Sequence, residues 1–189
     1  MQAIDALVSR RSATTLTEPA PDAGALELIF ASAVRAPDHG RLRPWRFLVV
    51  RGAARARFGE LLASHLARTQ PAASAESLQR ERDKAFRAPM IIVVAAHVNE
   101  AIKKIPPIEQ TLSAGVAAGN IMLAALALGY NAMWKTGGAA YDAEVRQSLG
   151  LGSSDVIVGF LYLGAEAGKP SVVRGEWRDL VHEWDGAAV

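Results

Sequence analysis

The chain contains no cysteine among its 189 residues. Disulfide bridges, thiolate metal sites and cysteine nucleophiles are therefore excluded, and the composition suits a reducing compartment. The segment MQAIDALVSRRS also lacks the continuous apolar core of a secretory signal, so we expect a cytoplasmic protein. A chain of this length that is 50% hydrophobic is expected to fold as one globular domain over residues 1–189.

The chain also has little excess of positive over negative charge. A net charge of +2 is too small for general binding of nucleic acid, which requires a broad basic surface. Arginine supplies most of the basic residues, and these are concentrated in the first half of the chain. Acidic residues such as Glu76 and Glu81 fall on charged, alanine-rich segments, and we expect them to be solvated.

The signatures of several enzyme classes are missing. The sequence contains no G-x-x-x-x-G-K-[ST] phosphate loop, no G-x-G-x-x-G after a strand and no G-x-S-x-G elbow. The four histidines show no metal-ligand spacing; they are His39, His65, His97 and His182. An enzyme with so few candidate acids, bases and nucleophiles is expected to borrow its chemistry from an organic cofactor.

Hydrophobic periodicity predicts helices that alternate with strands. Helices are expected over residues 2–9, from the cap at Asp22 to Pro37, twice within 53–87, and near 142–149. Strands are expected over residues 46–50, 90–96, 130–135 and 156–163. This order predicts an α+β sandwich with a central mixed sheet and a long buried helix.

That helix falls on residues 112–129, which carry no charge. The run is long enough to span a bilayer, but it is rich in alanine and glycine and has Asn120 in its middle, so a buried central helix is favoured. Its glycines would let a helix of a second subunit approach closely. The tail of about residues 166–189 carries Trp177 and Trp184, whose exposure would favour packing on a homodimer partner.

Arg10, Arg11 and Ser12 form the first candidate binding segment. Two guanidiniums and a hydroxyl within three residues suit a phosphate group. Paired arginines also complement the dipole at the carboxyl end of a helix, and the residues alone leave both interpretations open.

Two further segments offer polar groups on constrained backbone. The loop from Arg35 to Trp45 includes His39 and two prolines, and the run Trp134–Thr136 is followed by two glycines. Glycines would let the backbone of that turn approach a ligand directly. A solvent loop and a plain tight turn are the alternatives for these two segments.

Together the motifs resemble a known family. SRRS, RAPDHGRLRPW, SAGVAAGNIMLAALALGYNAMWKTG and VGFLYLG are similar, in order and spacing, to the minimal members of the nitroreductase family, the YdjA-like NAD(P)H nitroreductases. The similarity runs from about residue 4 to residue 165. It implies a nitroreductase-like fold and an FMN-dependent oxidoreductase. Such an enzyme takes hydride from NADH or NADPH and passes it to a nitroaromatic or quinone-like acceptor by a ping-pong mechanism.

The resemblance also implies a homodimer with FMN at the interface. The implied cofactor-binding residues are Arg10, Arg11, Ser12, Arg35, His39, Trp134, Lys135, Thr136 and Arg174. The first three match positions that hold the phosphate and ribityl end, and Arg35 and His39 match positions that reach the flavin from the partner chain. The run 134–136 matches the lining of the isoalloxazine ring, with a main-chain N–H bonded to N5, and Arg174 matches a late contact. No metal is implied.

Lys135 is the candidate for stabilising the negative charge of the reduced ring. Related chains have Trp-Arg-Ser where this chain has Trp-Lys-Thr, so a planar guanidinium fork is replaced by a point charge. Two other functions remain open. The chain could be an FMN-binding regulatory protein without turnover, or a flavin enzyme that catalyses dehalogenation or flavin fragmentation.

Overall fold

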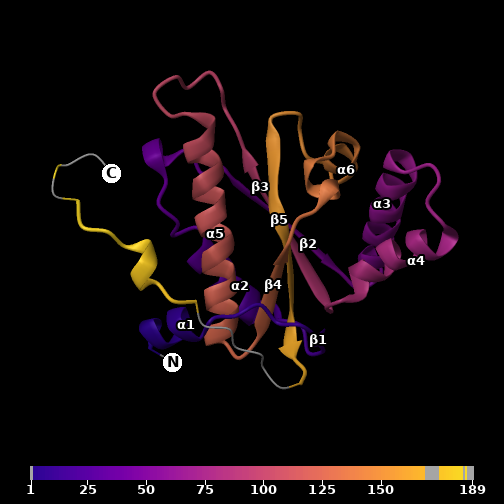
Figure 1. Ribbon diagram of the computed structural model, residues 1–189, viewed down its shortest axis with the longest axis horizontal. Coiled ribbons are helices and arrows are strands. Elements are labelled where there is room, and N and C mark those ends of the chain that lie inside the picture. The colour runs from indigo at the N-terminus through magenta and orange to yellow at the C-terminus, as the bar shows by residue number, and fades with distance from the viewer. Residues whose placement is uncertain (1, 169–174, 185, 187–189) are drawn as a thin grey trace.

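A five-stranded sheet forms the centre of the computed structural model, which describes residues 2–168, 175–184 and 186 (Figure 1). The strands are β1 (Leu16–Thr17), β2 (Trp45–Arg51), β3 (Met90–His97), β4 (Asn131–Lys135) and β5 (Asp155–Glu166). Their hydrogen-bonded order is β1-β5-β3-β2, and β4 also pairs with β5. The long strand β5 therefore connects most of the sheet.

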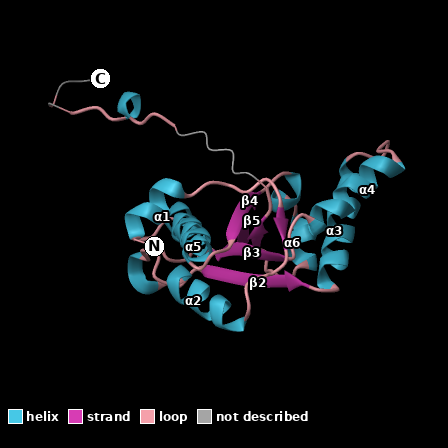
Figure 2. Cartoon of the chain, turned by 90° about the horizontal axis from the view of Figure 1, so that it is seen from below, coloured by secondary structure: helices cyan, strands magenta, loops and turns pink. Residues whose placement is uncertain are grey.

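Helices cover both faces of this sheet (Figures 1 and 2). On one face lie α1 (Ala3–Ser9), α2 (Ala23–Ala33) and α5 (Pro107–Ala127). On the other face lie α3 (Ala54–Thr69) and α6 (Ala143–Ser148), while α4 (Ala75–Asp83) packs on α3. Short 3₁₀ turns are η1 (His39–Arg41), η2 (Lys84–Phe86), η3 (Gly138–Tyr141) and η4 (Arg178–Leu180).

The alternation of side chains along β3 produces two cores. Ile91 and Val93 pack with the residues under α3 and α6, whereas Ile92 and Val94 pack with those under α2 and α5. All four side chains are fully buried. The continuous apolar run 90–96 is thus a strand covered on both faces, as its composition predicted. The α+β sandwich is confirmed.

The pairing of the strands differs from the expected mixed sheet, because all four described ladders are antiparallel. Two helices separate β2 from β3 and return the chain to the same end, so these neighbours run in opposite directions. A single helix, α5, joins β3 to β4, which makes those two strands parallel. The later strand β5 then inserts between them and pairs with both.

The buried central helix is confirmed, although α5 begins at Pro107, earlier than residue 112. Within the described parts of the chain, α5 alone is long and apolar enough to cross a membrane. It packs instead along β3 and β5, and Asn120 donates from its side chain to the carbonyl oxygen of Ser32 on α2 (3.1 Å). These contacts identify a core helix. One edge of it, at Leu112 and Val116, is exposed.

The remaining elements follow the sequence closely. Asp22 caps α2 by accepting from the N–H of Ala25 (2.8 Å), as expected of an aspartate before an apolar stripe. The strand β1 was not predicted, because its two residues are too few to show a period. The side chains of Trp177 and Trp184 are exposed, as expected.

Candidate functional site

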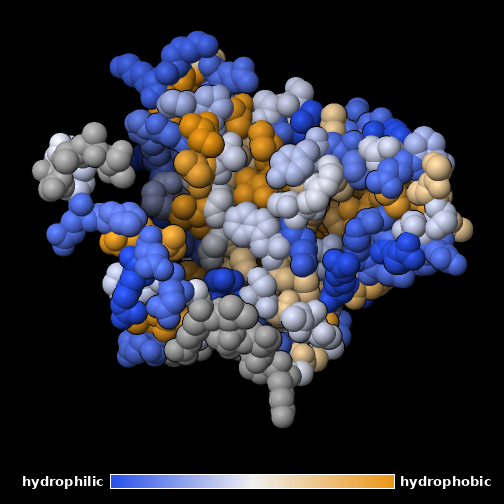
Figure 3. All heavy atoms as spheres, in the orientation of Figure 1, coloured by the Kyte–Doolittle hydropathy of each residue, from blue (hydrophilic) through white to orange (hydrophobic). Residues whose placement is uncertain are grey.

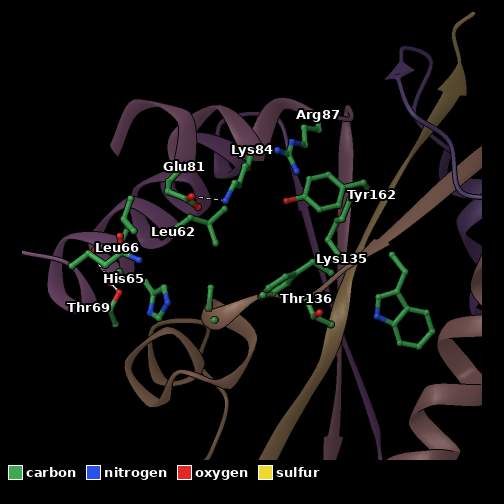
Figure 4. A pocket seen from close by; sticks show the side chains of 16 residues that line it. Leu62, His65, Leu66, Thr69, Glu81, Lys84, Arg87, Lys135, Thr136 and Tyr162 are labelled. Carbon is green, nitrogen blue, oxygen red and sulfur yellow. Dashed lines mark hydrogen bonds and ion pairs between the residues drawn. The ribbon is translucent and has the colours of Figure 1, made fainter. Parts of the chain in front are cut away.

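A cavity of about 560 Å³ opens between α3, η2 and the end of β4 (Figure 4). Aliphatic and aromatic side chains form its base, among them Leu62 and Phe160. Lys135 at the end of β4 and Thr136 in the turn that follows form one wall. A cavity of this size, with an apolar base and polar and charged groups around it, suits a small-molecule ligand.

Positive charge surrounds this cavity. Lys84 and Arg87 reach it from the segment before β3, and Lys135 reaches it from β4 (Figure 4). Glu81 forms an ion pair with Lys84. The buried phenol of Tyr162 lies beneath them, and burial raises its pKa to about 12. The cavity is therefore suited to a ligand that is anionic or becomes so.

Backbone groups at the free edge of β4 continue the site. The N–H of Ala13 donates to the carbonyl oxygen of Ala132 across 3.1 Å, so Ala132 faces away from β5. Alternation along the strand turns the N–H of Trp134 to the same edge. In the described ranges, that N–H has no hydrogen bond outside the sheet. The amino-terminal segment and the cavity thus lie at the two ends of one strand edge.

Arg10, Arg11 and Ser12 occupy the far end of this edge. Arg10 and Ser12 are exposed, while Arg11 forms an ion pair with Glu166 at the end of β5. The Nε atom of Arg11 is buried and has no hydrogen-bond partner among the described residues. The structure therefore separates an anchoring arginine from two residues that remain free to contact a phosphate.

Trp134 and Lys135 point to opposite faces of β4. The Nε1 atom of Trp134 lies 2.1 Å from the position that a Cβ on Gly159 would occupy, and the indole packs with the core under α2 and α5. Lys135 is paired with Phe160 and lies on the cavity side. All three residues of the run 134–136 contribute to the cavity lining, but the indole of Trp134 packs on the opposite face of the strand from Lys135.

Arg35 and His39 lie away from this cavity. Arg35 lines a separate hollow of about 280 Å³, and Nδ1 of His39 lies 2.6 Å from Oε2 of Glu109 on α5. Asp38 holds the loop by accepting from the N–H of Arg43 (2.7 Å), which has a positive φ of 49°. A non-glycine residue in that conformation is strained, and such strain is concentrated in functional loops. Within one chain this loop cannot meet the Lys135 end of the site.

Sequence reasoning missed several residues that line the cavity. The missed lining residues are His65, Glu81, Lys84, Arg87 and Tyr162. Glu81 is half-buried in its ion pair, so the expectation of a solvated side chain was wrong for it. Arg174 lies outside the described residues.

Residues 7–165 match the model of the nitroreductase family. The chain belongs to the nitroreductase family. It is 41% identical over 175 residues to YdjA, a proposed NAD(P)H nitroreductase of Escherichia coli (strain K12), covering 90% of this chain and 92% of that one. It is 36% identical to a proposed NAD(P)H nitroreductase of Haemophilus influenzae, covering 87% and 88%. The prediction of an oxidoreductase enzyme is confirmed by this membership.

Solved structures share the fold. A nitroreductase-like protein from Bacillus cereus superposes with a TM-score of 0.85 at 22% identity, covering 98% of this chain and 97% of that one. A proposed nitroreductase from Desulfovibrio desulfuricans, solved in complex with FMN, superposes with a TM-score of 0.76 at 26% identity, covering 97% of each. FMN is thus a cofactor found within this family, as the sequence predicted.

Proposed function

We propose that this chain is an FMN-dependent NAD(P)H oxidoreductase that reduces nitroaromatic or quinone-like acceptors. The observation that carries the proposal is the free edge of β4, which joins the exposed Arg10 and Ser12 to the cationic cavity at Lys135. FMN is elongated, with a phosphate at one end and a ring at the other, and this edge offers a suitable partner at each end. The unsatisfied donor at Arg11 fits the same ligand.

Each part of the site would contribute a different interaction. Arg10 and Ser12 would bind the phosphate, while the N–H of Trp134 or of the following turn would donate to the ring edge. Lys135 would stabilise negative charge that develops on the ring in a partly dry site. When bound, FMN would accept hydride from NAD(P)H and pass it on. The nucleotide and the acceptor would use the cavity in turn, which gives ping-pong kinetics.

Completion of the site requires a second copy of the chain. Exposed apolar residues lie on α1, α2 and α5, the helices that cover one face of the sheet; they are Ile4, Leu7, Val8, Leu28, Ile108, Leu112 and Val116. Figure 3 shows apolar atoms gathered over α5. An apolar surface of this kind is typical of an interface between subunits. We propose a homodimer in which Arg35 and His39 reach the flavin bound by the partner, and the exposed tail packs on that partner.

The alternatives have less support. A lid for dehalogenation or flavin fragmentation would have to come from the loop 98–106 or from the tail. That loop packs on the His39 segment, where Ile105 contacts Gly40, and not over the cavity. The proposed reaction also suits the cytoplasm, where NAD(P)H is supplied.

The decisive experiment reconstitutes the purified protein with FMN and follows NADPH oxidation with an aromatic nitro compound. We expect flavin absorbance that stays with the protein and turnover that depends on both substrates. Lys135→Gln should slow turnover, whereas Lys103→Gln, a substitution in the loop outside the cavity, should not. Protein that takes up no FMN would end the proposal. Uptake without NADPH oxidation would leave the regulatory alternative.

A further inference from the structure

His65 of α3 lies against the turn that follows β4. Its side chain is 17% exposed and lines the cavity described above (Figure 4). A Cβ built on Gly138 would lie only 2.8 Å from its Nε2 atom, so the ring occupies the space that a side chain at residue 138 would need. Gly138 lines the same cavity, which places Nε2 at the cavity wall.

The carboxylate of Asp142 lies on the Nδ1 side of this ring. The Nδ1 atom of His65 lies 3.2 Å from Oδ2 of Asp142. The other oxygen of Asp142 accepts from the side chain of Arg68 (2.7 Å) and from the N–H groups of Glu144 and Val145 (both 3.0 Å). These contacts, with Arg68 the strongest, hold the pKa of Asp142 well below its usual range. Asp142 therefore stays an anion beside the imidazole.

The Nδ1 atom itself is buried and makes no aligned hydrogen bond within the described parts of the chain. A buried polar atom without a partner is rare, because it loses its hydration and gains nothing in return. The Asp142 carboxylate would offset this loss of hydration most when the imidazole is protonated. Attraction between opposite charges needs less exact alignment than a hydrogen bond. The arrangement places an imidazole at the cavity with a carboxylate on the far side of its ring.

We propose that His65 donates a proton from Nε2 to the electron acceptor in this cavity, and that Asp142 is its positioning residue. The proposal rests on the proposed function. A quinone that receives a hydride gains two electrons and one proton, and it needs a second proton to leave as the hydroquinone. A nitro group likewise needs that second proton to leave as a nitroso group and water. Neutral His65 would then regain its proton from solvent.

The other titratable groups at the cavity are less suited to this task. Asp142 contacts His65 directly, and Arg68 and Glu144 lie behind it, since Arg68 pairs with both carboxylates. The other titratable groups that line the cavity are Glu81, Lys84, Arg87, Lys135 and Tyr162. Lysine and arginine side chains ordinarily keep their protons near neutral pH, and the pKa of Tyr162 is raised to about 12. Histidine is the residue type whose charge ordinarily changes between pH 5 and 8.

The test compares two acceptors in the FMN-loaded enzyme with NADPH. A quinone needs the proton, whereas ferricyanide takes electrons alone. For His65→Gln we expect quinone reduction to fall on the order of 100-fold, with ferricyanide reduction unchanged. Asp142→Asn, which keeps an oxygen for capping α6, should lower quinone reduction less. His97→Gln is the matched control, because His97 also contacts an aspartate, Asp155 (2.7 Å), but lies outside the cavity.

A second measurement separates this role from a structural one. The affinity of His65→Gln for FMN, measured by flavin fluorescence, should equal that of the wild type. Parallel loss of both activities, or no loss of quinone reduction, would overturn the proposal. If the variant does not fold, the wild type still decides. Quinone reduction should decline as the pH rises across the range in which histidine ordinarily loses its proton, while ferricyanide reduction does not. Parallel profiles would refute the role. A wild type inactive with ferricyanide contradicts the proposed function instead.

Discussion

The side-chain amide of Asn131 donates to the carboxylate of Glu166 across 2.9 Å, which joins the first residue of β4 to the last residue of β5. Glu166 also forms the ion pair with Arg11. Three segments far apart in the sequence are therefore fixed at one point. Because Arg11 is held there, its neighbours Arg10 and Ser12 are positioned at the edge of β4 before any ligand arrives.

The first prediction concerns these two neighbours. The double substitution Arg10→Ala and Ser12→Ala should weaken FMN binding by tenfold or more, since a hydrogen bond to a charged group is worth roughly 1.5–3 kcal/mol. Riboflavin has the same ring without the phosphate, so its affinity should stay the same. Titration of the apo-protein with each flavin, followed by fluorescence, measures both. Equal losses for the two flavins would show that this segment does not bind the phosphate.

The second prediction concerns the packing of Trp134 over Gly159. Gly159→Ala would place a methyl group 2.1 Å from Nε1 of the indole, so the ring must move. Overpacking of this kind costs about 1–3 kcal/mol, and urea denaturation should show a lower free energy of unfolding. Gly24→Ala is the control, because its Cβ would meet only an ordinary contact at 3.6 Å within a helix. That variant should be as stable as the wild type or more so, and wild-type stability of Gly159→Ala would contradict the packing.

Among the described residues, the sequence predicted every α-helix and every strand of five residues or more, because these carry their own period or cap. The apolar run in β3 and the Asp22 cap of α2 are examples. The direction of strand pairing did not follow from the sequence, since it depends on β5 inserting between β3 and β4. Local patterns contain no information about that insertion.

Of the candidate site, the sequence indicated only those residues that are adjacent in the chain. The run 134–136 was predicted as a binding segment from the two glycines that follow it and its place after a strand, and it lines the cavity. His65 and Lys84 lie on a helical hairpin that folds back over the end of β4, and Asp142 lies beyond the next turn. No spacing in the sequence relates His65 to Asp142, although their ring and carboxylate atoms are 3.2 Å apart. Only the tertiary structure brings them together.

The third prediction is a pH dependence of stability that arises from Asp142. Its pKa in the folded protein is lowered, first by the hydrogen bond from Arg68. A lowered pKa contributes stability above the unfolded value of about 3.9, and this contribution is lost as the pH falls through the folded value. Urea denaturation at pH 6 and pH 3 should show a larger drop for the wild type than for Asp142→Asn, whose amide does not titrate. Equal drops would contradict the role of Asp142.

The fourth prediction tests the dimer through Leu112, whose side chain is 60% exposed on α5. Leu112→Glu would bury an unpaired carboxylate if α5 forms the interface. That costs about 3 kcal/mol or more, so the dimer dissociation constant should rise more than 100-fold. Sedimentation at several concentrations measures this change. Val156→Glu, at an exposed position 42% accessible at the start of β5, is the control and should leave the assembly unchanged.

Loss of the dimer should also weaken FMN binding, although Leu112 lies outside the cavity. In the proposed dimer, Arg35 and His39 contact the flavin held by the partner, since in one chain they lie apart from the Lys135 end of the site. A monomeric Leu112→Glu protein that retained FMN at wild-type affinity would show that one chain suffices. In that case the hollow at Arg35 would need another explanation, and the strained loop before β2 would have no place in the flavin site.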